Sequence, residues 1–95
     1  MMLQLSDHAA RRAQQRGISR DAIELVSQLA DRRVRVPGGV HALSISERAR
    51  ERWVRGGLAP GEVDRTSRIV LIVDLTSSTI VTVEHTHGRR RRFRR

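Results

Sequence analysis

The side chains of this chain that could act on a phosphodiester are histidines and arginines, and they gather near its two ends. The last eleven residues read HTHGRRRRFRR and begin with His85. Cleavage of RNA through its 2′-OH needs a general base, a general acid and a cation that stabilises the phosphorane. Histidines beside arginines supply all three groups without a metal ion. His85, His87 and Arg89 therefore form one candidate catalytic group.

A second group with the same chemistry lies near the N-terminus. His8, Arg12 and Arg16 follow one another at intervals of four residues, so a helix would place them along one side. An imidazole with two guanidinium groups could hold a phosphodiester. The same spacing is also typical of a helix with a solvated basic edge, and both interpretations stay open at this point.

The C-terminal arginines predict an attraction to phosphate that does not depend on base sequence. Six of the nineteen arginines lie in the last seven residues, and such clusters bind polyanions through salt-sensitive contacts. Phe93, which stands among them, could stack on a base or pack on the sheet. The predicted nucleic-acid-binding residues are Arg90, Arg91, Arg92, Phe93, Arg94 and Arg95.

Metal chemistry is not what the sequence predicts. His85 and His87 could ligate a metal together from one strand face, but the chain has no cysteine and no HxxxH or HExxH pattern. We predict no metal and no other cofactor. Glu84 is the carboxylate nearest to these histidines in sequence, and we expect it either to orient one of them or to pair with an arginine.

The charge of the chain is concentrated at its C-terminus. The formal net charge is +9, and removal of the six tail arginines leaves +3. The length of 95 residues predicts one small domain, residues 1–88, followed by an arginine-rich tail, residues 89–95. The longest apolar run, Ile69–Val73, is too short to span a bilayer. Because no signal-peptide core is visible, we expect a cytoplasmic protein without a membrane partner.

The elements that must position these residues can be read from the hydrophobic pattern. Ser6 or Asp7 can cap a helix over Asp7–Arg16, which Gly17 can end in a left-handed conformation, and Arg20–Ala30 follows as a second helix. The remaining expected elements are strands over Val34–Val36, Val40–Ile45, Arg68–Leu75 and Thr79–His87, a helix over Ser46–Gly57 and a loop over Leu58–Arg65. The pattern predicts an α+β fold, with two N-terminal helices packed on a four-stranded, mainly antiparallel sheet and one short inserted helix.

Strict alternation along the last strand predicts which side chains share a face. One face is expected to hold Val81, Val83, His85 and His87, and the other Ile80, Thr82, Glu84 and Thr86.

The stretch SDHAARRAQQRGIS resembles the opening of a family of small bacterial domains of unknown function. That family shares an H-A-x-x-R-x-x-x-R-G-I motif, two helices and a sheet that ends in a "v-i-T-V" strand. The matching residues are His8, Ala9, Arg12, Arg16, Gly17 and Ile18 in the opening and Ile80, Val81, Thr82 and Val83 in the closing strand.

This family is similar to the RelE/ParE-like toxins, and the resemblance implies a RelE-like, or microbial ribonuclease-like, fold. The wider group contains metal-independent ribonucleases and gyrase-directed toxins. Many RelE-type toxins end with a histidine-arginine pair and then an aromatic residue, and His87, Arg89 and Phe93 are similar. Gly88 separates the pair here, and Phe93 has no hydroxyl for proton transfer, which leaves it a stacking role.

These observations predict a toxin-like, metal-independent endoribonuclease, the toxin component of a toxin–antitoxin pair. His85 or His87 would act as base or acid, with His8 as a further candidate, while Arg12, Arg16 and Arg89 would hold the scissile phosphate. The expected partners are RNA, including ribosome-bound mRNA, and an acidic antitoxin. The alternative is a non-catalytic basic module that binds nucleic acid or an acidic protein, such as a gyrase-directed toxin or a phage-encoded inhibitor.

Overall fold

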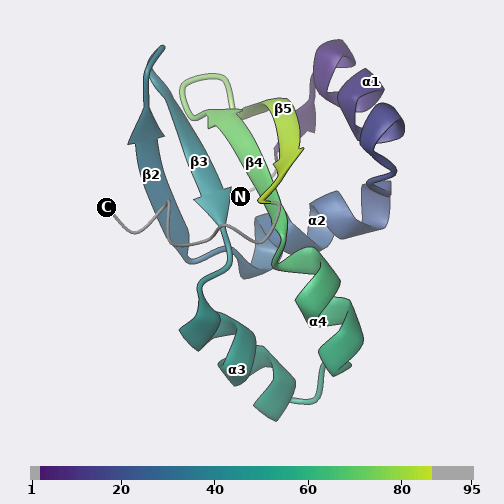
Figure 1. Ribbon diagram of the computed structural model, residues 1–95. Coiled ribbons are helices and arrows are strands. Elements are labelled where there is room, and N and C mark those ends of the chain that lie inside the picture. The colour runs from purple at the N-terminus through teal and green to yellow at the C-terminus, as the bar shows by residue number, and fades with distance from the viewer. Residues whose placement is uncertain (1–2, 87–95) are drawn as a thin grey trace.

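The computed structural model describes residues 3–86, which form four helices and a five-stranded sheet (Figure 1). The strands are β1 (Gln4–Leu5), β2 (Arg32–Val36), β3 (Val40–Ser44), β4 (Ile69–Asp74) and β5 (Thr79–His85). The helices are α1 (Asp7–Arg16), α2 (Arg20–Leu29), α3 (Glu47–Arg55) and α4 (Pro60–Thr66). The α+β class predicted from the sequence is confirmed. The predicted counts of three helices and four strands are wrong.

The two N-terminal helices begin and end where capping chemistry predicts. The Ser6 hydroxyl accepts a hydrogen bond from the Ala9 N–H at 3.0 Å. Gly17 closes α1 with a φ of 68°, and the Ile18 N–H then donates to the Ala13 carbonyl at 2.8 Å. This left-handed ending satisfies carbonyls that the helix would otherwise leave without a donor.

The sheet has the order β1-β5-β4-β3-β2, with the last of the described strands inside it. Strands β2 to β5 form an antiparallel meander, whereas β1 pairs with β5 in parallel. The sequence analysis missed β1, because two residues are too few to show a periodicity. Hydrogen bonds hold it in place, from the Gln4 N–H to the Ser78 carbonyl at 2.9 Å and from the Ser6 N–H to the Ile80 carbonyl at 3.0 Å.

The segment predicted as a loop, Leu58–Arg65, instead contains most of α4. Pro60 stands at the start of this helix, a position where its missing N–H costs nothing. The helix buries Val63 completely. Pro60-Gly61 resembles a turn signal in the sequence, and the burial of Val63 outweighs that local preference.

A β-bulge in the β4–β5 ladder changes which side chains of β5 share a face. Val73 pairs with Ile80 but Ile72 pairs with Thr82, so Val81 is the extra residue. Ile80 and Val83 both lie in the core as a result, at 2% and 0% exposure. The prediction that Ile80 lies on the face opposite Val83 is therefore wrong, because it assumed an uninterrupted alternation.

Most of the core lies between one face of the sheet and helices α1 and α2. In Figure 1, α2 runs behind the sheet, α1 lies beside β5, and α3 and α4 lie beyond one end of the strands. A second apolar cluster joins α2 to α3 through Leu29, Ile45 and Ala49, with Trp53 packed against it. No helix covers the front face of the sheet in residues 3–86, and we call this the open face.

Candidate nucleic-acid interface

Helix α1 is fixed against β5 by small side chains. Ala9 and Ala13 are buried at 0% and 6% exposure within the main core. Alanine lets the helix approach the strand closely, and helical periodicity then turns Arg12 and Arg16 toward the edge of β5. The HAxxRxxxR spacing thus sets both the packing of α1 and the direction of its arginines.

Glu84 binds both of these arginines. Arg12 Nη2 lies 3.0 Å from Glu84 Oε2, and Arg16 Nη2 lies 3.3 Å from Glu84 Oε1. All three side chains are about one-third exposed, at 34%, 32% and 34% for Arg12, Arg16 and Glu84. The expectation that Glu84 pairs with an arginine is confirmed, and it pairs with two. One carboxylate therefore holds two guanidinium groups side by side.

His85 lies at the C-terminal end of α1. Its Nε2 atom is 3.3 Å from the Arg16 carbonyl oxygen, one of the acceptors that a helix leaves open in its last turn. Glu84 and His85 are consecutive in a strand, so their side chains point to opposite faces of the sheet. Glu84 and the imidazole of His85 therefore do not face one phosphate together.

His8 lies at the other end of α1. It is exposed and stands eight residues before Arg16, which corresponds to roughly 12 Å along the helix axis. The structure thus brings the guanidinium groups of Arg12 and Arg16 together at Glu84, whereas His85 meets the backbone carbonyl of Arg16 on the other side of the strand. His8 lies one helical turn from Arg12 and two turns from the end of α1 where His85 is placed. His87 and Arg89, and the predicted binding residues Arg90, Arg91, Arg92, Phe93, Arg94 and Arg95, lie outside the described residues.

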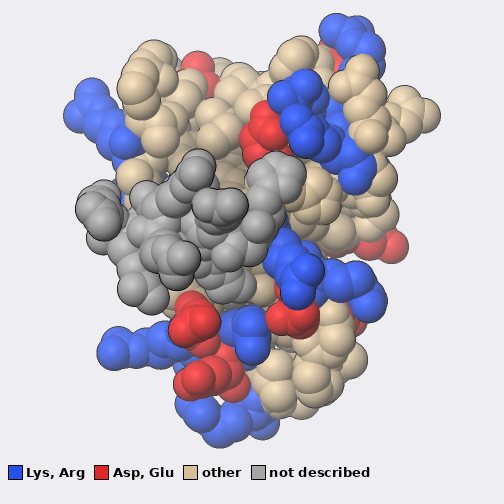
Figure 2. Space-filling model, in the orientation of Figure 1, with Lys and Arg blue, Asp and Glu red and all other residues tan. Residues whose placement is uncertain are grey.

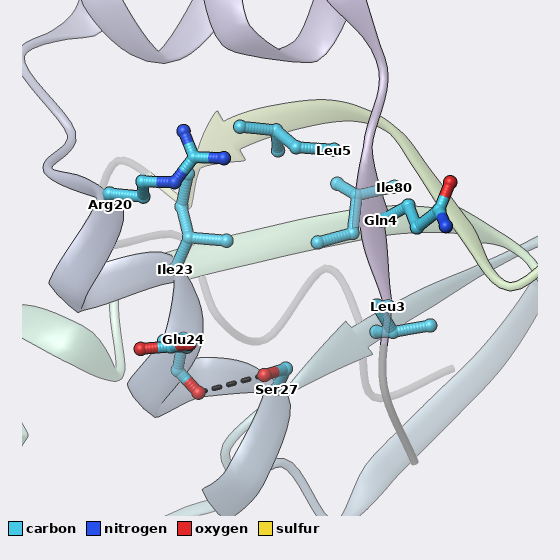
Figure 3. A pocket seen from close by; sticks show the side chains of 8 residues that line it. All are labelled: Leu3, Gln4, Leu5, Arg20, Ile23, Glu24, Ser27 and Ile80. Atoms are coloured by element: carbon cyan, nitrogen blue, oxygen red, sulfur yellow. Dashed lines mark hydrogen bonds between the residues drawn. The ribbon is translucent and has the colours of Figure 1, made fainter.

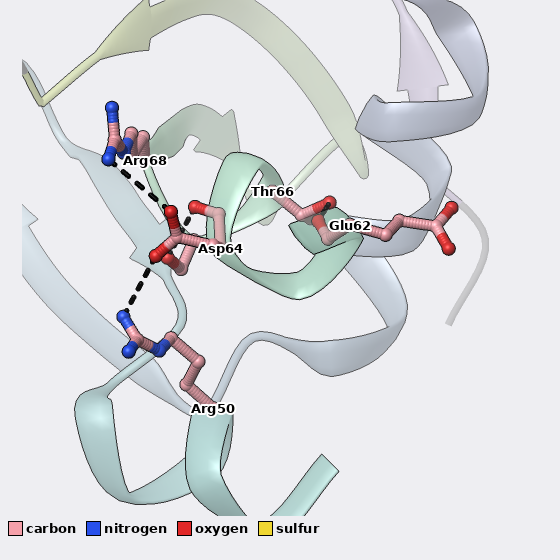
Figure 4. A network of polar contacts seen from close by, with 6 residues as sticks. Arg50, Glu62, Asp64, Thr66 and Arg68 are labelled. Atoms are coloured by element: carbon pink, nitrogen blue, oxygen red, sulfur yellow. Dashed lines mark hydrogen bonds and ion pairs between the residues drawn. The ribbon is translucent and has the colours of Figure 1, made fainter. Parts of the chain in front are cut away.

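A second network of similar form lies between α3 and α4 (Figure 4). Asp64 Oδ1 is 3.0 Å from Arg50 Nη1, and Asp64 Oδ2 is 3.3 Å from Arg68 Nη2. Sequence analysis missed this network. The sequence spacing of Asp64 and Arg68 is i,i+4, but Arg68 lies just beyond the C-terminal end of α4, so the contact depends on the turn that follows the helix.

The two networks meet at the end of β5. The Thr86 N–H donates to the Arg68 carbonyl at 2.8 Å, and Glu84 pairs with Val70. Arg68 and Glu84 are therefore diagonal neighbours on one face, with Cβ atoms about 7–8 Å apart. Figure 2 shows arginines interleaved with carboxylates over the α1 side of this face and over α3 and α4. We call Arg12, Arg16, Arg50 and Arg68, with Glu84 and Asp64, the arginine strip.

Two grooves in the described part of the chain lie away from the arginine strip. One groove, of about 420 Å³, runs between β1 and α2 (Figure 3), and Leu5, Ile23 and Ile80 are among the residues that line it. Another, of about 510 Å³, lies between the end of α2 and β2, beside Arg33. Neither groove is lined by a histidine. Neither groove is lined by a residue of the arginine strip.

Within residues 3–86, no three His, Cys, Asp or Glu side chains come together as metal ligands would. None of the described helices combines the length and apolar character that crossing a bilayer requires. Comparisons with family models, with curated proteins and with solved structures found no match to this chain. The resemblance to RelE/ParE-like toxins therefore stays a prediction that depends on the motif residues alone.

Proposed function

We propose that this protein is an RNA-binding module that contacts RNA phosphates along the arginine strip. The observation that supports this most directly is the pairing of Arg12 and Arg16 through one carboxylate, Glu84. Each arginine contacts Glu84 through a single Nη atom, so other donors of each guanidinium remain for a phosphate. Two planar forks held side by side suit the successive phosphates of a nucleic-acid backbone.

The charges around the strip support the same proposal. Four arginines share two carboxylates, which leaves a local excess of two positive charges. In the sequence, the arginine-rich segment of residues 89–95 begins three residues after Thr86, and the two networks meet at Thr86. Binding by such a surface is governed by phosphate contacts and falls steeply as salt rises.

Fluorescence anisotropy with a short labelled single-stranded RNA, measured over a range of salt concentrations, tests the proposal. Replacing both Arg12 and Arg16 by Ala should weaken binding and reduce the salt slope by about 1.4, for two lost contacts with a single strand. The matched control replaces Arg48 and Arg55, two exposed arginines of α3 that lie outside the strip, by Ala. Equal losses in both pairs would mean that only net charge matters and that the strip is not the interface.

A second candidate, favoured by the placement of His85, is the metal-independent endoribonuclease of RelE type predicted from the sequence. The reaction centre would lie at the end of α1, where the imidazole of His85 is beside the backbone carbonyl of Arg16. Because Glu84 faces away and His8 is distant, the second proton-transfer group would have to be His87. Under this proposal the protein is a toxin, and an acidic antitoxin would cover its basic surface.

Incubation of RNA with the protein in EDTA separates the two candidates. The endoribonuclease would produce fragments with 2′,3′-cyclic phosphate ends, and His85→Ala or His87→Ala would abolish them. Binding without cleavage, with and without ribosomes, would exclude the enzyme and leave the RNA-binding module.

A further inference from the structure

The outer edge of the sheet opposite α1 is formed by β2, a strand that has one neighbour among residues 3–86. All five residues of β2 pair with β3, and β2 stands last in the strand order. In Figure 1 no helix lies along its outer side. An edge strand of this kind directs alternate N–H and C=O groups outward, where a further strand can bind them.

From Arg33 to Val36, the side chains of β2 alternate between arginine on one face of the sheet and valine on the other, while Arg32 begins the strand on the valine face. The strand reads RRVRV. Arg33 and Arg35 are exposed and share the face on which α2 packs, whereas Val34 and Val36 are half-buried on the open face. Neither Arg33 nor Arg35 forms an ion pair with any of residues 3–86. Among residues 3–86, the edge therefore presents two positive charges without an ion-pair partner on one face, and Val34 and Val36 on the other.

These charges disfavour pairing with a second copy of the chain. In an antiparallel pair of β2 strands centred on Val34, Arg33 of each copy would stand directly opposite Arg35 of the other. Like charges in directly opposed positions destabilise a strand pair. The same two arginines that oppose self-pairing would attract a strand of opposite charge.

We infer that β2 is a docking edge for an extended acidic peptide segment of a partner protein, which adds to the sheet as a sixth strand beside Arg33 and Arg35. Main-chain hydrogen bonds would supply the pairing, and side chains would supply the selectivity. The segment would alternate acidic residues, next to Arg33 and Arg35, with β-branched or apolar residues, next to Val34 and Val36. The groove beside Arg33, of about 510 Å³ and floored by Leu43 and Leu75, would accept a longer side chain from the arginine-bearing face.

This inference does not depend on the RNA-binding proposal, because β2 and α1 lie at opposite margins of the sheet. Replacing Arg12 and Arg16 by Ala should leave peptide binding unchanged. Replacing Arg33 and Arg35 should leave the RNA contribution of Arg12 and Arg16 unchanged.

Titration of the isotopically labelled protein with the capped peptide Val-Glu-Val-Glu-Val, followed by NMR, tests the inference. We expect saturable shifts in the amides of residues 32–36 and new protection of outward-facing amides from hydrogen exchange. The scrambled peptide Val-Val-Glu-Glu-Val has the same charge but lacks the alternation, and it should bind about tenfold more weakly. The basic peptide Val-Arg-Val-Arg-Val should not bind.

Reversing the charges of Arg33 and Arg35 tests directly whether these two side chains select the charge of the peptide. The variant Arg33→Glu/Arg35→Glu should lose the acidic peptide and gain the basic one. Arg33→Gln/Arg35→Gln, a milder variant for use if the reversal impairs folding, should weaken acidic-peptide binding about tenfold or more. The matched control is Arg48→Glu/Arg55→Glu on α3, which changes net charge equally and should retain the preference for the acidic peptide.

Three outcomes would overturn the inference. Peptide-induced shifts outside β2 would place the site elsewhere, and equal losses in the α3 control would reduce the effect to net charge. Dimerisation in the absence of peptide, detected by sedimentation together with hydrogen-exchange protection of the amides of residues 32–36, would identify a second copy of the chain as the occupant.

Discussion

At the scale of single residues, Glu84 has two opposing effects. It stabilises the fold by pairing with Arg12 and Arg16, which come from the other end of the chain. It also competes with any phosphate for the same guanidinium groups. Glu84 therefore weakens phosphate binding by competition, but it holds the two guanidinium groups in a fixed arrangement.

Glu84→Gln should therefore separate the two effects. The change keeps the shape of the side chain but removes its charge, so RNA should bind more tightly. The free energy of unfolding should fall by at most about 1 kcal/mol, because the pair is partly exposed. Anisotropy and chemical denaturation measure the two quantities. Weaker RNA binding in this variant would contradict the competition and would show that the orientation of the arginines matters more.

Gly17 is a second residue whose effect can be isolated. Its φ of +68° is left-handed, and an added Cβ would meet nothing within 4 Å. Gly17→Ala should therefore destabilise the protein by about 1–2 kcal/mol through backbone strain alone.

Gly61→Ala is the matched control for Gly17→Ala. Gly61 lies in α4 without a positive φ, and its added Cβ would meet only Arg65 Nη1 at 3.9 Å. This change should be neutral or stabilising. Thermal unfolding of both variants measures the difference, and equal effects would refute the strain argument.

At the scale of elements, α3 is tied to the rest of the fold through its N-terminal cap. Ser46 Oγ accepts a hydrogen bond from the Ala49 N–H at 3.1 Å and donates one to Asp31 Oδ2 at 2.6 Å, while the Ser46 N–H donates to Asp31 Oδ1 at 2.8 Å. Burial alone would raise the pKa of Asp31, but the hydrogen bonds from Ser46 outweigh it and hold that pKa below its ordinary value of 3.8.

This cap should make stability depend on pH in the acid range. Because the folded-state pKa of Asp31 is lowered, its stabilisation is present above the unfolded-state pKa of 3.8 and is lost as the pH falls through the folded-state pKa. Asp31→Asn should flatten this part of the stability curve, as measured by denaturation at successive pH values. A curve unchanged from the wild type would show that Asp31 does not contribute.

Ser46→Ala should cost about 1 kcal/mol at neutral pH. The change removes the hydroxyl that caps α3 and one of the two donors to Asp31. Denaturation at neutral pH measures the cost. Ser27→Ala is a fair control, because the Ser27 hydroxyl of α2 contacts only the Glu24 carbonyl, at 2.7 Å. If both variants lost the same free energy of unfolding, the cap of α3 would contribute no more to stability than an ordinary hydroxyl contact within a helix.

The same elements show which parts of the fold a sequence can predict. Helix α1 and its boundaries were predictable, because Ser6, Gly17 and the alanine spacing are local signals. Helix α4 and β1 were not, because the burial of Val63 and the pairing of β1 with β5 depend on distant residues. The bulge at Val81 likewise depends on how β5 matches β4. Among the predicted site residues, Arg12 and Arg16 were placed together by helical spacing, whereas the separation of His8 from His85 needed the full fold.

At the scale of the whole molecule, the distribution of charge matters more than its total. The net charge of +9 falls to +3 without residues 89–95. A protein that ends at residue 88 should keep its fold but bind RNA with a salt slope lower by about 4, for six lost contacts with a single strand. Anisotropy over a range of salt concentrations measures the slope, and circular dichroism verifies the fold. An unchanged slope would exclude the tail from the interface.

The pairing of β1 and α1 with β5 also has a consequence for the order in which the protein can fold. Residues 4–16 find their partners more than sixty residues later, in the strand that leaves the ribosome last of all the described elements. The first helix therefore lacks its main packing partner until β5 has been synthesised. Contacts so distant in sequence slow folding, because a long loop must close before they can form. The nascent N-terminal segment should thus stay accessible to chaperones until β5 has left the ribosome, and the arginine strip should assemble only then.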